Sequence, residues 1–268
     1  MKLSNTIPRW SVSTLAGLGF SLLSANAAVV APPVNNDIFL AFRASGNLGA
    51  TTSYLVNLGQ YSQFRDATAN STITLSLGNL GADLVATYGS DWNTRSDLYW
   101  GIFGVSNTAN PTVYASRAES TPGTLSNAWP LLDSISRGST ANQITSVLQG
   151  VSGYQGSEAT SNSTVAAVQA NTANTSSYNK QVATAGTNDF GSTSSWSSIE
   201  GNFGAGTAGT ALDLYRISPS VVADPGHFTL SDSGVVSFTA IPEPSSAGLA
   251  AAGVLPLLTN RRRRHLSK

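Results

Sequence analysis

A period of two in the side-chain pattern marks both ends of the central part of this chain. In the segment DIFLAFRAS, Ile38, Leu40 and Phe42 fall on one face of the alternation, and Phe39, Ala41 and Arg43 fall on the other. In GHFTLSDSGVVSFTA, two alternating runs flank the turn residues Asp-Ser-Gly at positions 232–234, which is a β-hairpin signature. A period of two gathers apolar side chains on one face of a strand but scatters them around a helix. Both ends of the central part are therefore predicted to be β-strands.

Further segments between these ends also have strand character. TSYLVNL follows the glycine-rich turn GNLGAT, which predicts a hairpin with DIFLAFRAS. The remaining candidate strands are STITLSLG, with Ile73, Leu75 and Leu77 on one side, the pair DLYWGIFGVSN and PTVYASRAE around an Asn-Pro turn, and ALDLYRISP. One early segment differs, because NLGADLVATYG predicts a short helix with Asn79 as its cap and Gly89 as its stop.

The middle of the chain is predicted to be helical. LLDSISRGSTANQITSVLQGVSGY and STVAAVQANTANTSSYNKQVATAG both favour helices, and the first supplies four apolar contacts: Ile135, Ile144, Val147 and Leu148. The stretch from Gly156 to Glu200 is rich in Ser, Thr, Ala and Asn, which fits either a thin helical layer or a mobile insertion. Strands at both ends with helices between them indicate an α+β fold, an antiparallel β-sheet with helices on one side. A β-sandwich with a helical insertion is the alternative.

Charge and composition exclude several classes of function. The formal net charge is zero, but residues 28–260 hold all 14 acidic residues and only seven Lys or Arg. An acidic body does not fit a nucleic-acid binder, which needs a cationic face. The chain has no cysteine, so disulfides and thiolate metal sites are excluded.

The first 27 residues are predicted to be a secretory signal peptide. Lys2 and Arg9 provide a positive start, and residues 12–23 form an apolar stretch too short for a comfortable membrane anchor. Ala25 and Ala27 form the small-x-small site at which signal peptidase would cut. Residues 28–240 would then form the extracytoplasmic domain.

Residues 241–268 have a separate composition. Residues 245–260 carry no charge, and as a helix these 16 residues would span ~24 Å, short of the ~30 Å hydrocarbon core of a bilayer. The four arginines Arg261, Arg262, Arg263 and Arg264 follow directly and would act as a cytoplasmic stop signal. A short C-terminal transmembrane helix is predicted, with an ordinary core helix as the alternative.

The order of motifs in this tail resembles the PEP-CTERM sorting signal of Gram-negative bacteria. The resemblance rests on Pro242, Glu243 and Pro244, the apolar span and the terminal arginine cluster, over about 27 residues. It implies recognition by exosortase, a membrane-embedded enzyme that cuts near the Pro-Glu-Pro motif in bacteria that make exopolysaccharide. The segments NNDIFLAFRASGNLGATTSYLVNLGQYSQF and YGSDWNTRSDLYWGIFGV also resemble ectodomains that precede this tail in Verrucomicrobia-like bacteria. That second resemblance implies a shared fold and no activity.

Few residues in the body suggest chemistry. His227 is the only histidine between the two terminal segments, and we interpret it as a surface or strand-edge residue at the start of a strand, because no nucleophile motif accompanies it. Asp91, Asn93 and Asp97 have the odd-numbered spacing of a calcium loop, but Arg95 interrupts the pattern and no glutamate closes it. No metal or cofactor is expected.

A cluster of aromatic residues leaves a carbohydrate-binding alternative open. Trp92, Tyr99, Trp100, Phe103 and Tyr114 fit a sugar-stacking platform, although aromatic residues in strands more often belong to the core.

We therefore expect an exported, exosortase-processed protein of the cell surface or exopolysaccharide matrix, without catalytic activity. It would be anchored first in the inner membrane through its tail. The alternative is a secreted carbohydrate-binding or carbohydrate-active protein that acts on the exopolysaccharide. The expected partners are exosortase, signal peptidase with the secretion machinery, the membrane and the exopolysaccharide, but no nucleic acid.

Overall fold

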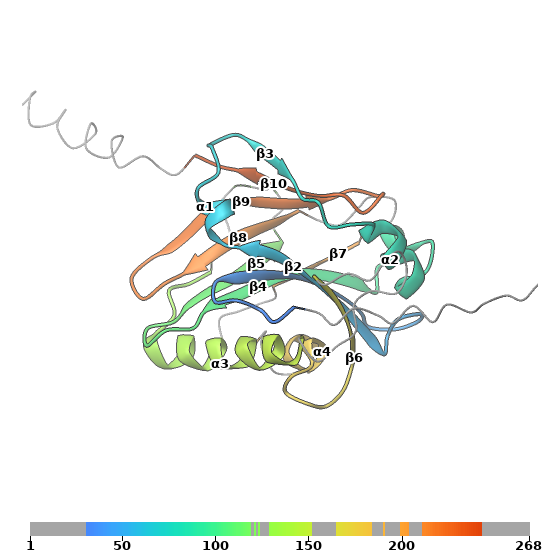
Figure 1. Cartoon of the computed structure of the whole chain (residues 1–268), viewed down its shortest axis with the longest axis horizontal. Helices are drawn as coiled ribbons and strands as arrows, with labels where there is room; N and C mark the ends of the chain where they lie inside the picture. The colour runs from blue at the N-terminus through green and yellow to red at the C-terminus, as the bar shows by residue number, and fades with distance from the viewer. Residues whose placement is uncertain are drawn as a thin grey trace, which may run out of the picture.

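The fold is given by a computed structural model, which describes residues 31–118, 121, 123, 129–151, 165–183, 190, 199–203 and 211–242 (Figure 1). The elements in chain order are β1 (Asp37–Ala44), β2 (Thr52–Gln60), α1 (Ser62–Arg65), β3 (Thr72–Thr74), α2 (Leu80–Tyr88), the 3-10 helix η1 (Trp92–Thr94), β4 (Leu98–Ser106), β5 (Thr112–Ala118), α3 (Ser134–Val151), β6 (Ala166–Ala170), α4 (Tyr178–Ala183), β7 (Glu200–Asn202), β8 (Leu212–Ile217), β9 (Val222–Leu230) and β10 (Val236–Ala240).

The ten strands of the described residues form one antiparallel sheet that curls into a half-barrel (Figure 1). The strand order is β3-β10-β9-β8-β5-β4-β1-β2-β6, and β7 pairs with β4 beside this path. Strands from the two ends of the chain thus share one sheet, as the alternating patterns predicted. The α+β class is confirmed in this coarse form, and the β-sandwich alternative is not observed in this part of the chain.

The two predicted hairpins are confirmed. β1 pairs with β2 around the GNLGAT turn, and β9 pairs with β10 around residues 232–234. In the second turn the Gly234 N–H donates to the carbonyl of Ser231, and Gly234 has a φ of 84°, which a residue with a Cβ adopts only under strain. The Asp-Ser-Gly sequence therefore predicts this turn for a clear physical reason.

The central strand β1 is buried on both faces, whereas the sequence predicted helices on one side of the sheet only. Ile38, Leu40 and Phe42 of β1 face a core that also holds residues of α1 and α2. Phe39 and Ala41 face a second core that holds residues of α3 and α4. Figure 1 shows α3 and α4 together on one side of the sheet. The expectation that helices cover one side was wrong, because residues of α1 and α2 pack on one face and residues of α3 and α4 pack on the other. All eight residues of β1, which lies between β2 and β4, are accordingly buried.

The short helix α2 follows the sequence prediction at both ends. The side chain of Asn79 accepts a hydrogen bond from the Ala82 N–H, which satisfies one of the donors left open at a helix start. Gly89 ends the helix with a φ of 99°. Leu84 and Tyr88 on its inner face are fully buried against the sheet.

One predicted contact of α3 is wrong. Ile144, Val147 and Leu148 are buried as expected, but Ile135 is 86% exposed. Ile135 precedes Ile144 by nine residues, which at about 100° per residue places it half a turn round the helix from the buried face. The prediction used only the apolar character of Ile135, whereas the position of a residue around the helix axis determines whether it reaches the core.

The second predicted helix, over residues 163–186, is only partly helical. Its first part forms strand β6, which pairs with β2 from Thr52 to Val56, and its last part includes helix α4. Alanine-rich residues favour helices locally. Here the open edge of β2 provides a ladder of hydrogen-bonding partners, and this long-range pairing overrides the local preference. The described parts of the stretch from Gly156 to Glu200 thus contain strands as well as a helix, and its other residues lie outside the described ranges.

Candidate functional site

Most of the predicted sorting residues lie outside the described residues. These are Ala25 and Ala27 of the signal cleavage site, Glu243 and Pro244 of the sorting motif, and Arg261, Arg262, Arg263 and Arg264 of the stop signal. The predicted transmembrane segment, residues 245–260, also lies outside. No helix within the described ranges is long and apolar enough to cross a membrane.

Pro242 is the one sorting-motif residue that the structure places. The preceding strand β10 is bonded on both sides, to β9 and to β3. The Ile241 N–H donates to the carbonyl of Pro225, and Pro242 after it is exposed. Within the described residues, the last hydrogen bond of the sheet is thus made by Ile241, and the motif begins at the next residue, which is exposed.

In residues 91–97, the segment with the interrupted calcium-loop spacing, Arg95 holds neighbouring segments together by hydrogen bonds. Arg95 is buried, and its guanidinium donates to both carboxylate oxygens of Asp97, at 2.9 and 2.7 Å. It also donates to the carbonyls of Gly46, Leu48 and Tyr88. The bond from Arg95 lowers the pKa of Asp97, and Asn47 donates to the same carboxylate. No group of three metal-ligating residues occurs among the described residues, and the Asp97 carboxylate is already occupied by Arg95 and Asn47.

The aromatic cluster does not form a sugar-stacking surface. Trp92, Trp100, Phe103 and Tyr114 are all buried in the two cores. Tyr99 is half-buried, and its ring lies 4.7 Å beneath the guanidinium of Arg43. The observation that motivated the carbohydrate alternative therefore has a structural explanation.

His227 lies within β9 and not at its start, because the strand begins five residues earlier at Val222. It pairs across the sheet with Asp213 on β8 and with Thr239 on β10. The side chain is half-buried, and burial lowers the pKa of the imidazole. The described chain shows no hydrogen-bond partner for its Nδ1 atom. In the described part of the chain, His227 is thus a half-buried residue within the sheet.

A buried ion pair lies on the face of the sheet that carries α4. Arg43 on β1 donates from Nε to Glu200 on β7 at 3.0 Å and from Nη2 at 2.5 Å. The Tyr178 hydroxyl donates to the same carboxylate at 2.8 Å. Burial raises the pKa of Glu200, while the bonds from Arg43 and Tyr178 oppose that rise. These contacts join β1, β7 and α4 and leave the carboxylate enclosed, which indicates a structural role.

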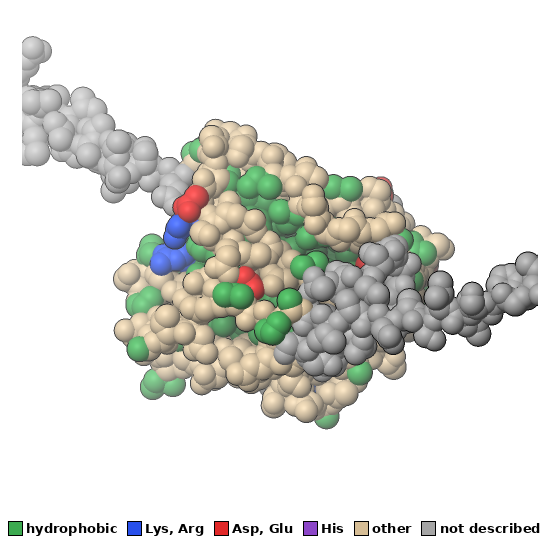
Figure 2. All heavy atoms as spheres, in the orientation of Figure 1, with side chains coloured by type: hydrophobic (Ala, Val, Ile, Leu, Met, Phe, Trp, Pro, Cys, Tyr) green, Lys and Arg blue, Asp and Glu red, His purple; other side chains and the backbone are tan. Residues whose placement is uncertain are grey.

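Arginine side chains in the described part of the chain contact carboxylates, carbonyls and one aromatic ring. These contacts are Arg43 with Glu200, Arg95 with Asp97, Arg137 with the carbonyls of Pro111 and Leu132, Arg65 with Asp66 at an exposed site, and Arg117 over the ring of Trp129. Figure 2 accordingly shows a face with few charged side chains. Such a surface is hydrated mainly by hydroxyl and amide groups and has little to attract a polyanion.

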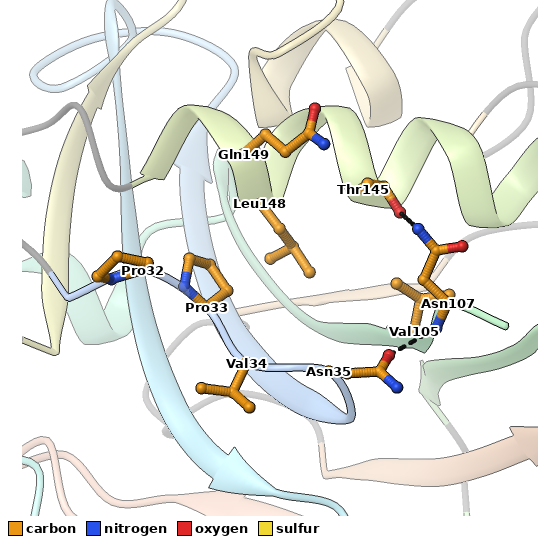
Figure 3. A pocket seen from close by; sticks show the side chains of 9 residues that line it. All are labelled: Pro32, Pro33, Val34, Asn35, Val105, Asn107, Thr145, Leu148 and Gln149. Carbon is orange, nitrogen blue, oxygen red and sulfur yellow. Dashed lines mark hydrogen bonds between the residues drawn. The ribbon is translucent and has the colours of Figure 1, made fainter.

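A cleft of about 440 Å³ lies between helix α3 and the segment before β1 (Figure 3). We call residues 32–35 the strap. The cleft is lined by the strap residues Pro32, Pro33, Val34 and Asn35, by Val105 and Asn107 at the end of β4, and by Thr145, Leu148 and Gln149 of α3. Figure 3 shows Leu148 pointing from α3 toward the space between the strap and Val105. The cleft has the size of a small-ligand site.

The sequence analysis did not predict the cleft, because the residues that line it lie far apart in the sequence. Its polar groups come from positions 35, 107, 145 and 149, and no motif connects them. Only the rigid pair Pro32-Pro33 is a local signal. Folding places the strap beside the end of β4, because the Asn36 N–H donates to the carbonyl of Val105 and the Asn107 N–H donates to the Asn35 side chain. The Asn107 side chain in turn donates to Thr145 of α3 at 3.5 Å.

Comparison with known proteins adds no relative. No family model matches the chain, and neither a curated protein nor a solved structure matches it.

Proposed function

We propose that the chain is an exported protein of the cell surface or exopolysaccharide matrix whose tail is processed by exosortase. In this proposal signal peptidase removes residues 1–27, and the body folds outside the cytoplasm. The tail holds the precursor in the inner membrane, with Arg261–Arg264 as the cytoplasmic stop. Charged groups oppose passage through the bilayer at ~2.5–3.5 kcal/mol each near a helix centre, so four together disfavour slippage.

The observation that supports this proposal best is the position of Pro242. A protease that cuts at Pro242-Glu243-Pro244 needs an extended, accessible segment, and a site within a paired strand would be protected. The last described backbone bond of the sheet is made by Ile241, and Pro242 is exposed immediately after it. Cleavage beyond this residue would release the body with its sheet complete. The body is proposed to act without catalysis.

The proposal is tested by measuring the mass of the mature protein in its host, with and without exosortase. We expect a product that lacks the tail only when the enzyme is present. Replacing the motif by Pro242→Ala, Glu243→Gln and Pro244→Ala should give an uncut chain. Asp232→Asn, at an exposed acid of the β9–β10 turn, is the matched control and should be cut normally. An intact tail in the presence of exosortase would contradict the proposal.

A further inference from the structure

We infer that the outer edge of strand β3 pairs with the same edge of a second copy of this chain. The two strands would run antiparallel around a two-fold axis at Thr74, and the two sheets would join into one. This inference goes beyond the proposed function and does not depend on export or on processing of the tail.

The first argument is the direction of the backbone groups of β3. On its inner edge Ile73 pairs with Phe238 of β10, and the Leu75 N–H donates to a carbonyl of the same strand. Because backbone groups alternate along a strand, those of Thr72 and Thr74 point to the outer edge. β3 is the last strand in the order of the sheet, at the upper margin of Figure 1, and both threonines are exposed. Among the described residues, none forms a backbone hydrogen bond with them on that edge.

The same alternation continues for two residues beyond β3. Residues 71–78 alternate in burial, with the hydroxyl residues exposed and the apolar residues half-buried: Thr72, Thr74 and Ser76 are exposed, and Ile73, Leu75 and Leu77 are half-buried against the inner core. A period of two is the pattern of an extended chain with one face in water. The backbone groups of Ser76 therefore continue the open row of the two threonines.

This edge lacks most of the features that protect sheet edges from pairing. Natural proteins commonly use charged side chains, proline or bulges for this purpose. β3 contains only threonine and isoleucine, and its pairing with β10 shows no register shift. Its short length is the only such feature here, and it limits the strength of pairing without preventing it.

The sequence of the edge is complementary to itself. With Thr74 opposite Thr74 of the copy, Thr72 lies opposite Ser76, so open residues meet open residues and each pair exchanges two backbone hydrogen bonds. In this register Ile73 lies opposite Leu75 of the copy. Residues directly opposite each other lie on the same face, so hydroxyl groups meet on the outer face and apolar groups meet on the core face. Such self-complementarity is what a two-fold interface requires.

A cavity of about 340 Å³ beside this edge leaves apolar surface uncovered. It is lined by residues 75–77 and by residues 57–59 at the end of β2, so it lies between the two sides of the curled sheet. Figure 2, in the orientation of Figure 1, shows hydrophobic side chains at the surface between β3 and β2. Ile73 of a second copy would lie beside Leu75 and remove part of this surface from water, which favours association.

Cross-linking tests the register directly, because the chain has no cysteine of its own. In the inferred pair the two copies of residue 74 have Cα atoms about 5.5 Å apart, within the range of a disulfide. Thr74→Cys should therefore form a disulfide-linked dimer of the full chain in oxidised glutathione. Thr72→Cys is the matched control, an exposed threonine of the same edge whose two copies would lie more than about 13 Å apart. It should cross-link at least about tenfold more slowly.

Sedimentation of the full chain in a mild detergent, which keeps its apolar ends apart, gives a second measurement. So short a strand pair buries less than the roughly 1,200 Å² of a stable interface, so we expect a Kd of about 100 μM. Thr74→Pro removes only an outward N–H and should weaken association at least about tenfold. Ala69→Pro is the control, because exposed Ala69 lies in the turn that the Ser71 N–H closes by donating to the carbonyl of Thr68. It should associate like the unmodified chain.

Three results would overturn the inference: no disulfide-linked dimer of Thr74→Cys, equal cross-linking of Thr72→Cys, or equal association of the two proline variants. Circular dichroism verifies that each variant is folded. If Thr74→Pro does not fold, the cysteine variants decide alone, since they keep every backbone group. None of these measurements involves exosortase, so their outcome is separate from that of the proposed function.

Discussion

At the scale of single residues, two glycines fix the contact between α2 and the β9–β10 turn. A Cβ on Gly81 would lie 2.2 Å from the carbonyl oxygen of Ser233, and one on Gly234 would lie 2.4 Å from the Gly81 nitrogen. Both close neighbours are backbone atoms, which cannot swing aside as a flexible side chain can. The helix and the turn therefore approach each other more closely than residues with side chains allow.

We expect Gly81→Ala to lower the free energy of unfolding by about 1–3 kcal/mol, the usual effect of overpacking. Gly138→Ala is the control, because Gly138 also lies in a helix but has nothing within 4 Å of its added Cβ. The control should raise stability by about 0.5–1 kcal/mol, since alanine favours a helix interior more than glycine does. Urea unfolding of both variants measures the difference. Equal stabilisation by the two substitutions would show that α2 and the turn are not in close contact.

His227 should make stability depend on pH. Burial lowers the pKa of the folded imidazole below its ordinary value of 6.5, so the unfolded chain binds the proton more readily. Stability should be constant above pH 6.5 with respect to this group and should fall as the pH decreases below that value.

His227→Gln, which cannot be protonated, should remove this part of the acid-side loss. Urea unfolding at about pH 8 and about pH 5 provides the comparison, with the unmodified chain as reference. If both proteins lose the same stability between these two pH values, burial does not control the titration of this histidine.

At the scale of elements, Arg95 joins three segments that strands alone would leave loose. Its five hydrogen bonds reach the turn between β1 and β2, the end of α2 and the start of β4. We expect Arg95→Gln to destabilise the fold by about 2–4 kcal/mol, because it leaves buried acceptors and the Asp97 carboxylate without their donor. Arg95→Lys should recover only part of this loss, since an ammonium has three donors and no planar fork.

The matched control for Arg95 is Arg65→Gln. Arg65 also pairs with a neighbouring aspartate, but both side chains are more than half exposed. Solvent screens such a pair, so no measurable change is expected. Thermal unfolding compares the variants, and a control as damaging as Arg95→Gln would show that the buried contacts are not the cause.

The elements also show how far the sequence alone could predict the structure. Alternation predicted β1, β2, β4, β5 and the β9–β10 hairpin, because a strand with apolar residues on one face leaves a local pattern. Asn79 and Gly89 predicted the ends of α2 because a capping residue and a helix-ending glycine are also local signals. β6 was missed because its pairing with β2 joins residues more than a hundred positions apart. The cleft was missed on the same grounds, since its lining is assembled by tertiary contacts and by no local motif.

At the scale of the whole molecule, the described sheet ends at Ile241, and we expect the residues after Pro242 to add nothing to its stability. A chain that ends at Pro242 should unfold at the same temperature as the full chain. A chain that ends at Val235 lacks β10 and should be unfolded or marginally stable. Phe238 on β10 packs against Phe64 and Phe228, with ring centroids 5.0 and 4.9 Å apart. Loss of one such buried phenylalanine costs about 3–5 kcal/mol, compared with a typical total of about 5–15 kcal/mol.

Circular dichroism during heating measures both truncated chains. A clear loss of stability in the chain that ends at Pro242 would mean that later residues belong to the fold.

The position of β10 in the sheet also determines when the N-terminal elements can complete their packing during synthesis. α1, β3 and α2 all lie within the first third of the chain, yet each depends on its last folded strands: Phe64 of α1 contacts Phe238, β3 pairs with β10, and Gly81 of α2 meets the β9–β10 turn. A chain that emerges from the ribosome N-terminus first cannot complete this core until residues 236–240 have appeared. It would remain incompletely folded for most of its synthesis. If the chain is exported as we propose, it must cross a narrow secretory channel in such a state, and the strand order itself would then delay folding until the body has nearly crossed.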